Sequence, residues 1–241
     1  MIHLLFGLMA LIFSPDKALA NEIMFEGYYR FELSGKHVGY SIQRYEFDPK
    51  SKAFESVSFV YLKIGEDITQ RSLKSRCNDK FEPLSYQYTS QDGKELKTID
   101  ATFKGEIMSA KISDGHKVKT ETSKIPKGTI LSSFLTYLML QKPMKLGQEF
   151  KYSGIAEEDA TSHWGKAKII GRDEKTGYVS LKASNSFKGE DFVSVIGATP
   201  DAKEKDHYTK AEIFNTSAPT SALVATLVTT PNSATAGLNV P

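Results

Sequence analysis

TILSSFLTYLMLQK, residues 129–142, is a dense apolar segment that follows a long series of predicted strands, and this contrast decides the fold. At the roughly 100° per residue of an α-helix, its apolar side chains cover most of the circumference. The polar remainder lies on one narrow side and consists of Thr129, Ser132, Ser133 and Thr136. We therefore predict one helix that is buried on most sides and ends before Pro143, because proline cannot continue a helix.

Short apolar segments separated by Gly, Pro, Asn and Asp turns precede this helix, from about Tyr28 to Lys127. Alternating apolar positions between regularly spaced turn residues are typical of antiparallel strands. Asp92-Gly93 is a strong hairpin signal, since this pair tolerates the positive φ of a type I′ turn. No segment of crossover length interrupts the series, so we predict a meander. Its strands are Tyr28–Leu33, Val38–Phe47, Phe54–Ile64, Ile68–Arg76, Leu84–Thr89, Leu96–Phe103, Ile107–Ile112 and Val118–Ile125.

Strands resume after the helix, and no linker divides the chain into two cores. The charged segment Ala198–Lys210 is predicted to be an exposed loop. The remaining strands are Glu149–Ile155, Trp164–Arg172, Gly177–Ser186, Phe192–Ile196, Ile213–Phe214 and Leu223–Val228. We therefore predict a mainly β fold, a curved antiparallel meander sheet that forms an open or half barrel with one apolar α-helix packed on it.

The first twenty residues have the pattern of an export signal. Leu4 to Phe13 form an apolar core, and Ala18-Leu19-Ala20 supplies the small-x-small pattern that signal peptidase cuts. The apolar run is shorter than the roughly 20 residues that span a bilayer. The segment Met1–His3 lacks the usual Lys or Arg, and the alternative is a buried N-terminal strand or helix.

The export signal predicts a periplasmic or secreted protein without a transmembrane segment after cleavage. The predicted organisation is a cleaved signal peptide over residues 1–20, a single β-rich domain over 21–228 and a flexible C-terminal tail over 229–241.

Composition limits the partners and the means of stabilisation. The formal net charge of +2 gives no electrostatic argument for a nucleic-acid partner or a membrane surface. Because Cys77 is the only cysteine, an intramolecular disulfide cannot form. With 40% hydrophobic residues the chain can instead bury a substantial core.

The segment Phe54–Ile64 is apolar on both faces of its predicted strand, with Val57 and Tyr61 on one side and Val60 and Leu62 on the other. A strand with one wet face alternates more cleanly, so we expect cover on both faces. The helix either completes the core on one face or acts as a lid over an apolar cavity. Aromatic residues that line such a cavity would orient an amphipathic ligand through their hydroxyls. The candidate ligand-binding residues are Phe59, Tyr61, Tyr86, Tyr88, Phe134, Leu138 and Trp164.

The sequence predicts no catalytic centre. Cys77 lies at a strand end without a nearby His to activate it. Ser132-Ser133 lacks the Gly-x-Ser-x-Gly elbow, and the histidines occur singly rather than at metal-ligand spacings. The acidic turns Glu157-Glu158-Asp159 and Glu190-Asp191 are expected to be solvated, with a weak calcium site at either as the alternative. We therefore expect a protein that is not an enzyme and has no metal and no cofactor.

Three short motifs carry a resemblance to a known kind of domain: Gly35-Lys36-His37-Val38-Gly39-Tyr40, Glu82-Pro83-Leu84-Ser85-Tyr86, and the helix followed by Leu146-Gly147-Gln148-Glu149-Phe150. They resemble a β-rich, uncharacterised domain of exported bacterial proteins, over about residues 26–228. That domain is often found in front of a transglutaminase-like catalytic core, and its topology is similar to that of periplasmic lipoprotein carriers. The resemblance implies fold and compartment but no ligand residues, and we expect this copy to act without a catalytic core.

These observations leave three hypotheses for function. The leading one is a non-catalytic periplasmic protein that binds a hydrophobic or lipid-like group in the concave sheet beneath the helix. The second is an envelope interaction module with a solid core that pairs an edge strand with a protein partner. The third, an accessory to a separate enzyme, follows from the resemblance alone.

Overall fold

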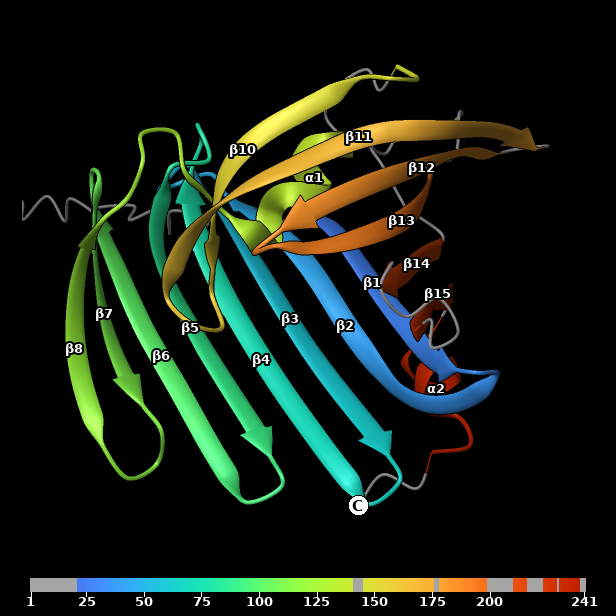
Figure 1. Ribbon diagram of the computed structural model, residues 1–241, viewed down its shortest axis with the longest axis horizontal. Helices are drawn as coiled ribbons and strands as arrows, with labels where there is room; N and C mark the ends of the chain where they lie inside the picture. Colours follow the sequence, from blue (N-terminus) through green and yellow to red (C-terminus); the bar gives the residue numbers. More distant parts are fainter. Residues whose placement is uncertain are drawn as a thin grey trace, which may run out of the picture.

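The computed structural model describes residues 21–140, 145–175, 178–198, 210–215, 223–228 and 230–238 (Figure 1). The predicted signal peptide and nearly all of the predicted loop Ala198–Lys210 lie outside these described residues. The described strands follow one continuous order, β8-β7-β6-β5-β4-β3-β2-β1-β15-β14-β13-β12-β11-β10-β9. This order has two ends, so the sheet is open, and the predicted mainly β fold is confirmed.

The first eight strands form the predicted meander, in which each strand pairs antiparallel with the one before it. Their alternating apolar positions place one side chain in two on the core side. The strands are β1 (Glu22–Leu33), β2 (Lys36–Asp48), β3 (Ala53–Ile64), β4 (Asp67–Asn78), β5 (Pro83–Asp92), β6 (Glu95–Lys104), β7 (Ile107–Ser113) and β8 (Val118–Lys124).

Turn chemistry fixes the register of these hairpins. Ser34 and Gly35 join β1 to β2 with φ of 52° and 76°, the pattern of a type I′ turn. The hairpin at Asp92 differs from the sequence prediction, because Asp92 itself pairs with Glu95. Its loop residues are then Gly93 and Lys94, and of these two only Gly93 has a positive φ, 60°, as in a type II′ turn.

Within the apolar segment 129–142, the described residues form a helix that begins later than the period predicts. Ile130–Leu131 is a two-residue strand, β9, that pairs in parallel with β10 (Glu149–Ala156). A 3₁₀ turn, η1 (Ser132–Phe134), and the helix α1 (Leu135–Leu140) follow. The predicted helix therefore starts too early, since the backbone of its first residues pairs with a strand that comes later in the chain.

The second half of the chain extends the sheet from β1, which pairs with β15. In Figure 1, β10–β13 cross the upper ends of β1–β5. The remaining strands are β11 (Thr161–Lys175), β12 (Tyr178–Phe187), β13 (Glu190–Ala198), β14 (Lys210–Asn215) and β15 (Leu223–Val228).

A short helix, α2 (Pro231–Thr235), lies within the segment that the sequence predicts to be a flexible tail. The side chain of Thr230 caps it by accepting from the Ser233 backbone N–H. Just beyond α2, the Ala236 carbonyl accepts from Arg30 Nη1 and lies 3.0 Å from His37 Nδ1, which ties the end of the chain to β1 and β2. No helix in the described part of the chain is long and apolar enough to cross a membrane.

One face of β1–β8 carries most of the buried core, and we call it the inner face. It presents Phe25, Tyr45, Cys77, Tyr86 and Ile99, all of which are less than 5% exposed. Tyr45 Oη donates a 2.8 Å hydrogen bond to the Ser133 carbonyl of η1, so this is the face that α1 and η1 cover. The opposite side of the same strands is the outer face.

Candidate functional site

Aromatic rings fill the space between α1 and the inner face. We call Tyr45, Phe54, Phe81, Phe134 and Tyr137 the aromatic cap. Their ring centroids lie 4.8 Å apart for Phe54 and Phe81, 5.3 Å for Tyr45 and Tyr137, and 6.0 Å for Phe81 and Phe134. Phe134 is 1% exposed. The helix therefore completes a packed core at this end of the sheet.

A buried carboxyl joins the turn between β10 and β11 to η1. Glu157 is 2% exposed, and its carboxylate accepts from Ser132 Oγ and, at 3.1 Å, from the Ser133 backbone N–H. Burial raises the pKa of Glu157 and outweighs these hydrogen bonds, which lower it. The prediction of a solvated acidic turn is thus wrong for Glu157, since a Glu in a run of three acids carries no sequence signal of burial.

The neighbours of Glu157 fit the expectation of exposed acidic side chains better. Glu158 and Asp159 lie 2.8 and 2.5 Å from Lys188 Nζ. In the described part of the chain, no group of three or more His, Cys, Asp or Glu side chains is arranged to hold a metal ion.

The seven residues predicted to bind a ligand fall into separate places. Phe134 is in the aromatic cap, and Leu138 packs against the core. Tyr86 and Tyr88 lie on the inner face, 1% and 8% exposed. They therefore share one face with the cap without forming one pocket with it.

The other three predicted residues lie elsewhere. Phe59 and Tyr61 pack on the outer face against Tyr40, with ring centroids 5.9 and 5.5 Å from it. Trp164 on β11 is 71% exposed. Sequence period separates the two faces of a strand, but it does not reveal which side chains of another strand cover each face.

A large hollow lies on the inner face, away from the aromatic cap and next to the turn between β10 and β11. This inner-face groove has a volume of about 890 Å³. Tyr88 and Ser90 of β5 form part of its lining, with Arg71 of β4, Lys97 of β6 and Glu158 from the turn between β10 and β11. β4, β5 and β6 are labelled in Figure 1, where the turn between β5 and β6 is at their lower ends.

An apolar row on β3 adjoins the groove on the same face. Val60 pairs with Arg71, Leu62 pairs with Thr69, and Ile64 ends the row at 48% exposed. These are residues of the doubly apolar strand seen in the sequence. On this side its cover is incomplete, so apolar surface remains next to the groove.

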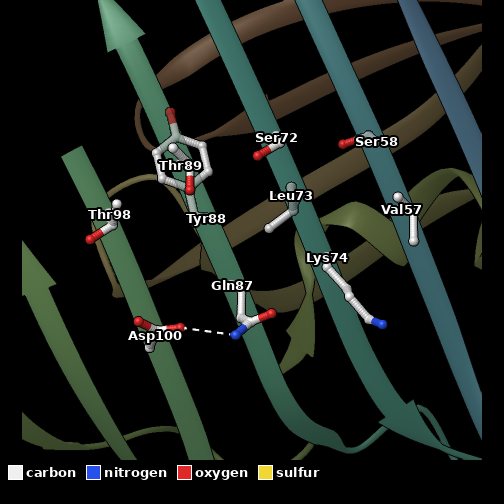
Figure 2. A pocket seen from close by; sticks show the side chains of 10 residues that line it. All are labelled: Val57, Ser58, Ser72, Leu73, Lys74, Gln87, Tyr88, Thr89, Thr98 and Asp100. Carbon is white, nitrogen blue, oxygen red and sulfur yellow. Dashed lines mark hydrogen bonds between the residues drawn. The ribbon is translucent and has the colours of Figure 1, made fainter. Parts of the chain in front are cut away.

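The outer face has a smaller hollow, which Figure 2 shows from the side opposite α1. It has a volume of about 370 Å³, and Val57, Lys74, Gln87 and Asp100 are among its lining residues. Gln87 Nε2 donates a 3.1 Å hydrogen bond to Asp100 Oδ1 across it. The remaining lining consists of Ser58, Ser72, Thr89 and Thr98, together with Leu73 and Tyr88.

Cys77 is fully buried on the inner face. Burial raises the pKa of its thiol to about 12, so the thiol stays protonated at neutral pH. The structure gives it the environment of a core residue rather than of an activated nucleophile.

Comparison with known proteins identifies the fold but not a family. No protein-family model and no curated protein matches the sequence. The structure is similar to the crystal structure of a beta-barrel-like protein of the domain of unknown function DUF1849 from Brucella abortus, with a TM-score of 0.57 and 7% sequence identity. The match covers 84% of this chain and 94% of that chain. At this identity the chain shares with that protein a β-barrel-like fold of unknown function.

Proposed function

We propose that this protein is a non-catalytic binding protein of the periplasm or the exterior that holds a hydrophobic or lipid-like group on its inner face. The observation that carries the proposal is the groove of about 890 Å³ beside the apolar row of β3. Pockets for small ligands have volumes of roughly 300–1,000 Å³ and combine apolar lining with a few polar groups. The groove has a volume in this range. Its own lining is mostly polar and charged, with Tyr88 and Leu96 as apolar residues, and the apolar row of β3 lies beside it.

The proposed place differs from the one that the sequence suggests. Beneath α1 the aromatic cap occupies the concave face, and Phe134 is 1% exposed. Towards the other end of the inner face, Val60 and Leu62 of β3 are only partly buried against the core. A ligand that covered Val60 and Leu62 would bury the apolar surface that these residues of β3 leave exposed.

A fluorescence titration with N-phenyl-1-naphthylamine, a neutral apolar probe, tests this proposal. We expect saturable binding that Val60→Glu abolishes, because Val60 borders the groove. Val57→Glu is the matched control, since it makes the same change on the outer face of the same strand, where Val57 is 36% exposed. Equal binding by both variants, each checked for folding by circular dichroism, would contradict the proposed site.

A second candidate function has one specific observation in its favour. β8 lies at one end of the strand order, and all seven of its residues are exposed. Among the described strands only β7 pairs with it, which leaves its other edge for a partner strand. Lys119 and Glu121, which lie 2.7 Å apart, are charges of the kind that also protect edges from unwanted pairing.

Cross-linking followed by purification from envelope extracts separates the two functions. A stoichiometric protein partner, together with a lack of probe binding, would favour the edge-pairing module. The binding proposal predicts probe binding by the purified chain alone.

A further inference from the structure

A row of polar and basic side chains crosses the inner-face groove. Strand register places Arg71 opposite Ser90, and Ser90 opposite Lys97, so the three lie side by side on β4, β5 and β6. The next row towards the aromatic cap is apolar and contains Leu73, Tyr88 and Ile99. Along the inner face, this apolar row is followed by the basic row and then by the row that contains Asp92 and Glu95.

The positive charge of this row is available to a ligand. Arg71 is exposed and forms no ion pair within the described part of the chain. Lys97 Nζ donates a 2.7 Å hydrogen bond to the Glu158 carbonyl, a neutral acceptor that leaves the charge of the ammonium group uncompensated.

Four acidic side chains also line the groove, and in the described part of the chain only Glu158 among them forms an ion pair. Asp92 accepts from Ser90 Oγ at 3.1 Å. Asp114 accepts from the backbone N–H groups of His116 and Lys117, which lower its pKa. The Glu158 carboxylate pairs with Lys188. Glu95 lies at the hairpin end of the groove, two strand positions from Lys97 on the same face, and follows Lys94 of the turn.

We propose that the groove selects single-chain amphiphiles with an anionic head group, a carboxylate in the simplest case. The head binds the guanidinium of Arg71, whose planar fork matches a carboxylate, and the ammonium of Lys97 lies two strands away on the same row. The chain covers Val60 and Leu62 of β3, where Val60 is the direct strand partner of Arg71. This inference rests on the proposed function and names the ligand class of the same groove.

Three ligands with the same twelve-carbon chain test the head-group preference: dodecanoate, dodecanol and dodecylammonium. Isothermal titration calorimetry on the purified protein measures each directly, below the concentration at which it aggregates. We expect dodecanoate to bind about tenfold more tightly than dodecanol, and dodecylammonium more weakly than either, as one charge-assisted contact implies.

Substitutions of Arg71 test whether the basic row causes the preference for the anionic head group. Arg71→Gln is expected to remove the preference for dodecanoate and to leave dodecanol affinity unchanged. Arg71→Lys is expected to keep part of the preference for dodecanoate. Lys111→Gln is the matched control, because it removes one positive charge from an exposed outer-face position of β7, opposite Asp100. Arg71 is exposed, so these variants should fold, and thermal unfolding checks this.

The outcomes separate the two proposals. Equal affinity for dodecanoate and dodecanol, or the same loss in Arg71→Gln and Lys111→Gln, would overturn the anionic preference and leave the binding function standing. No binding of any of the three ligands or of N-phenyl-1-naphthylamine would overturn both.

Discussion

A single buried carboxyl, Glu157, makes stability depend on pH in an unusual direction. Because burial raises its pKa from the ordinary 4.5, the folded protein binds this proton more tightly than the unfolded chain does. The stabilising contribution is complete below the ordinary pKa and is lost as pH rises through the raised one. Most paired carboxylates behave in the opposite way.

Glu157→Gln tests this, because it keeps a neutral group in the same place. The wild-type free energy of unfolding minus that of the variant should fall as pH rises from about 4 to 8. Urea unfolding at a series of pH values measures it. A difference that does not change with pH, or that grows, would show that Glu157 is charged in the folded protein across this range.

Cys77 should report on unfolding rather than on chemistry. Its burial and its pKa of about 12 predict very slow alkylation by iodoacetamide at pH 8 in the folded protein. Urea should make the reaction fast, and mass spectrometry counts the modified fraction. Rapid labelling of the folded protein would contradict the packing of the inner face around Cys77.

Gly39 occupies a place that admits no side chain. A Cβ there would lie 2.0 Å from the Tyr61 backbone oxygen and 2.9 Å from Leu62 Cδ2. Gly39→Ala is therefore expected to destabilise the protein by about 1–3 kcal/mol or more in chemical unfolding. Gly154→Ala is the matched control, since its nearest neighbour, a ring carbon of Phe187 at 3.1 Å, can give way. A larger loss in Gly154→Ala would contradict the β2–β3 register.

The elements differ in how far their sequence predicts them. The meander follows from its period and turns because each strand pairs with its neighbour in the chain. The start of the helix cannot be predicted from the local period, because β9 pairs with β10, which comes after α1 in the chain. No local pattern in Ile130–Leu131 reveals that pairing.

The candidate site shows the same limit. The sequence identifies β3 as apolar on both sides, and the structure confirms that Tyr61 and Val60 lie on opposite faces. The sequence alone could not show that Tyr40 packs on Tyr61 on the outer side, or that Val60 and Leu62 on the inner side are only partly buried. Arg71 and Lys97 were missed because their closeness depends on the register of β4, β5 and β6.

The aromatic cap should be a stability element and not part of the binding site. Phe134→Ala is expected to cost about 3–5 kcal/mol, since it leaves a cavity among packed rings. Trp164→Ala, at a residue 71% exposed, should change stability by no more than about 0.5 kcal/mol. At temperatures where both variants are folded, each should bind N-phenyl-1-naphthylamine as the wild type does. Loss of binding in Phe134→Ala alone would contradict this account and indicate that the ligand binds beneath α1.

The described part of the chain covers one end of its concave sheet more completely than the other. η1, α1 and the turn between β10 and β11 fill one end of the inner face through Tyr45, Phe134 and Glu157. The other end carries an apolar row on β3 and a basic row across β4–β6. With this division, the proposed binding is confined to the end of the inner face that lies away from the aromatic cap.

Methyl nuclear magnetic resonance during a titration with dodecanoate tests this account most directly. We predict saturable shifts for the methyl groups of Val60, Leu62 and Leu73, and none for Leu131 and Ile155, which are fully buried near the aromatic cap. Shifts confined to Leu131 and Ile155 would contradict the account by placing the ligand beneath α1. An absence of shifts at all five residues would contradict binding on the inner face altogether.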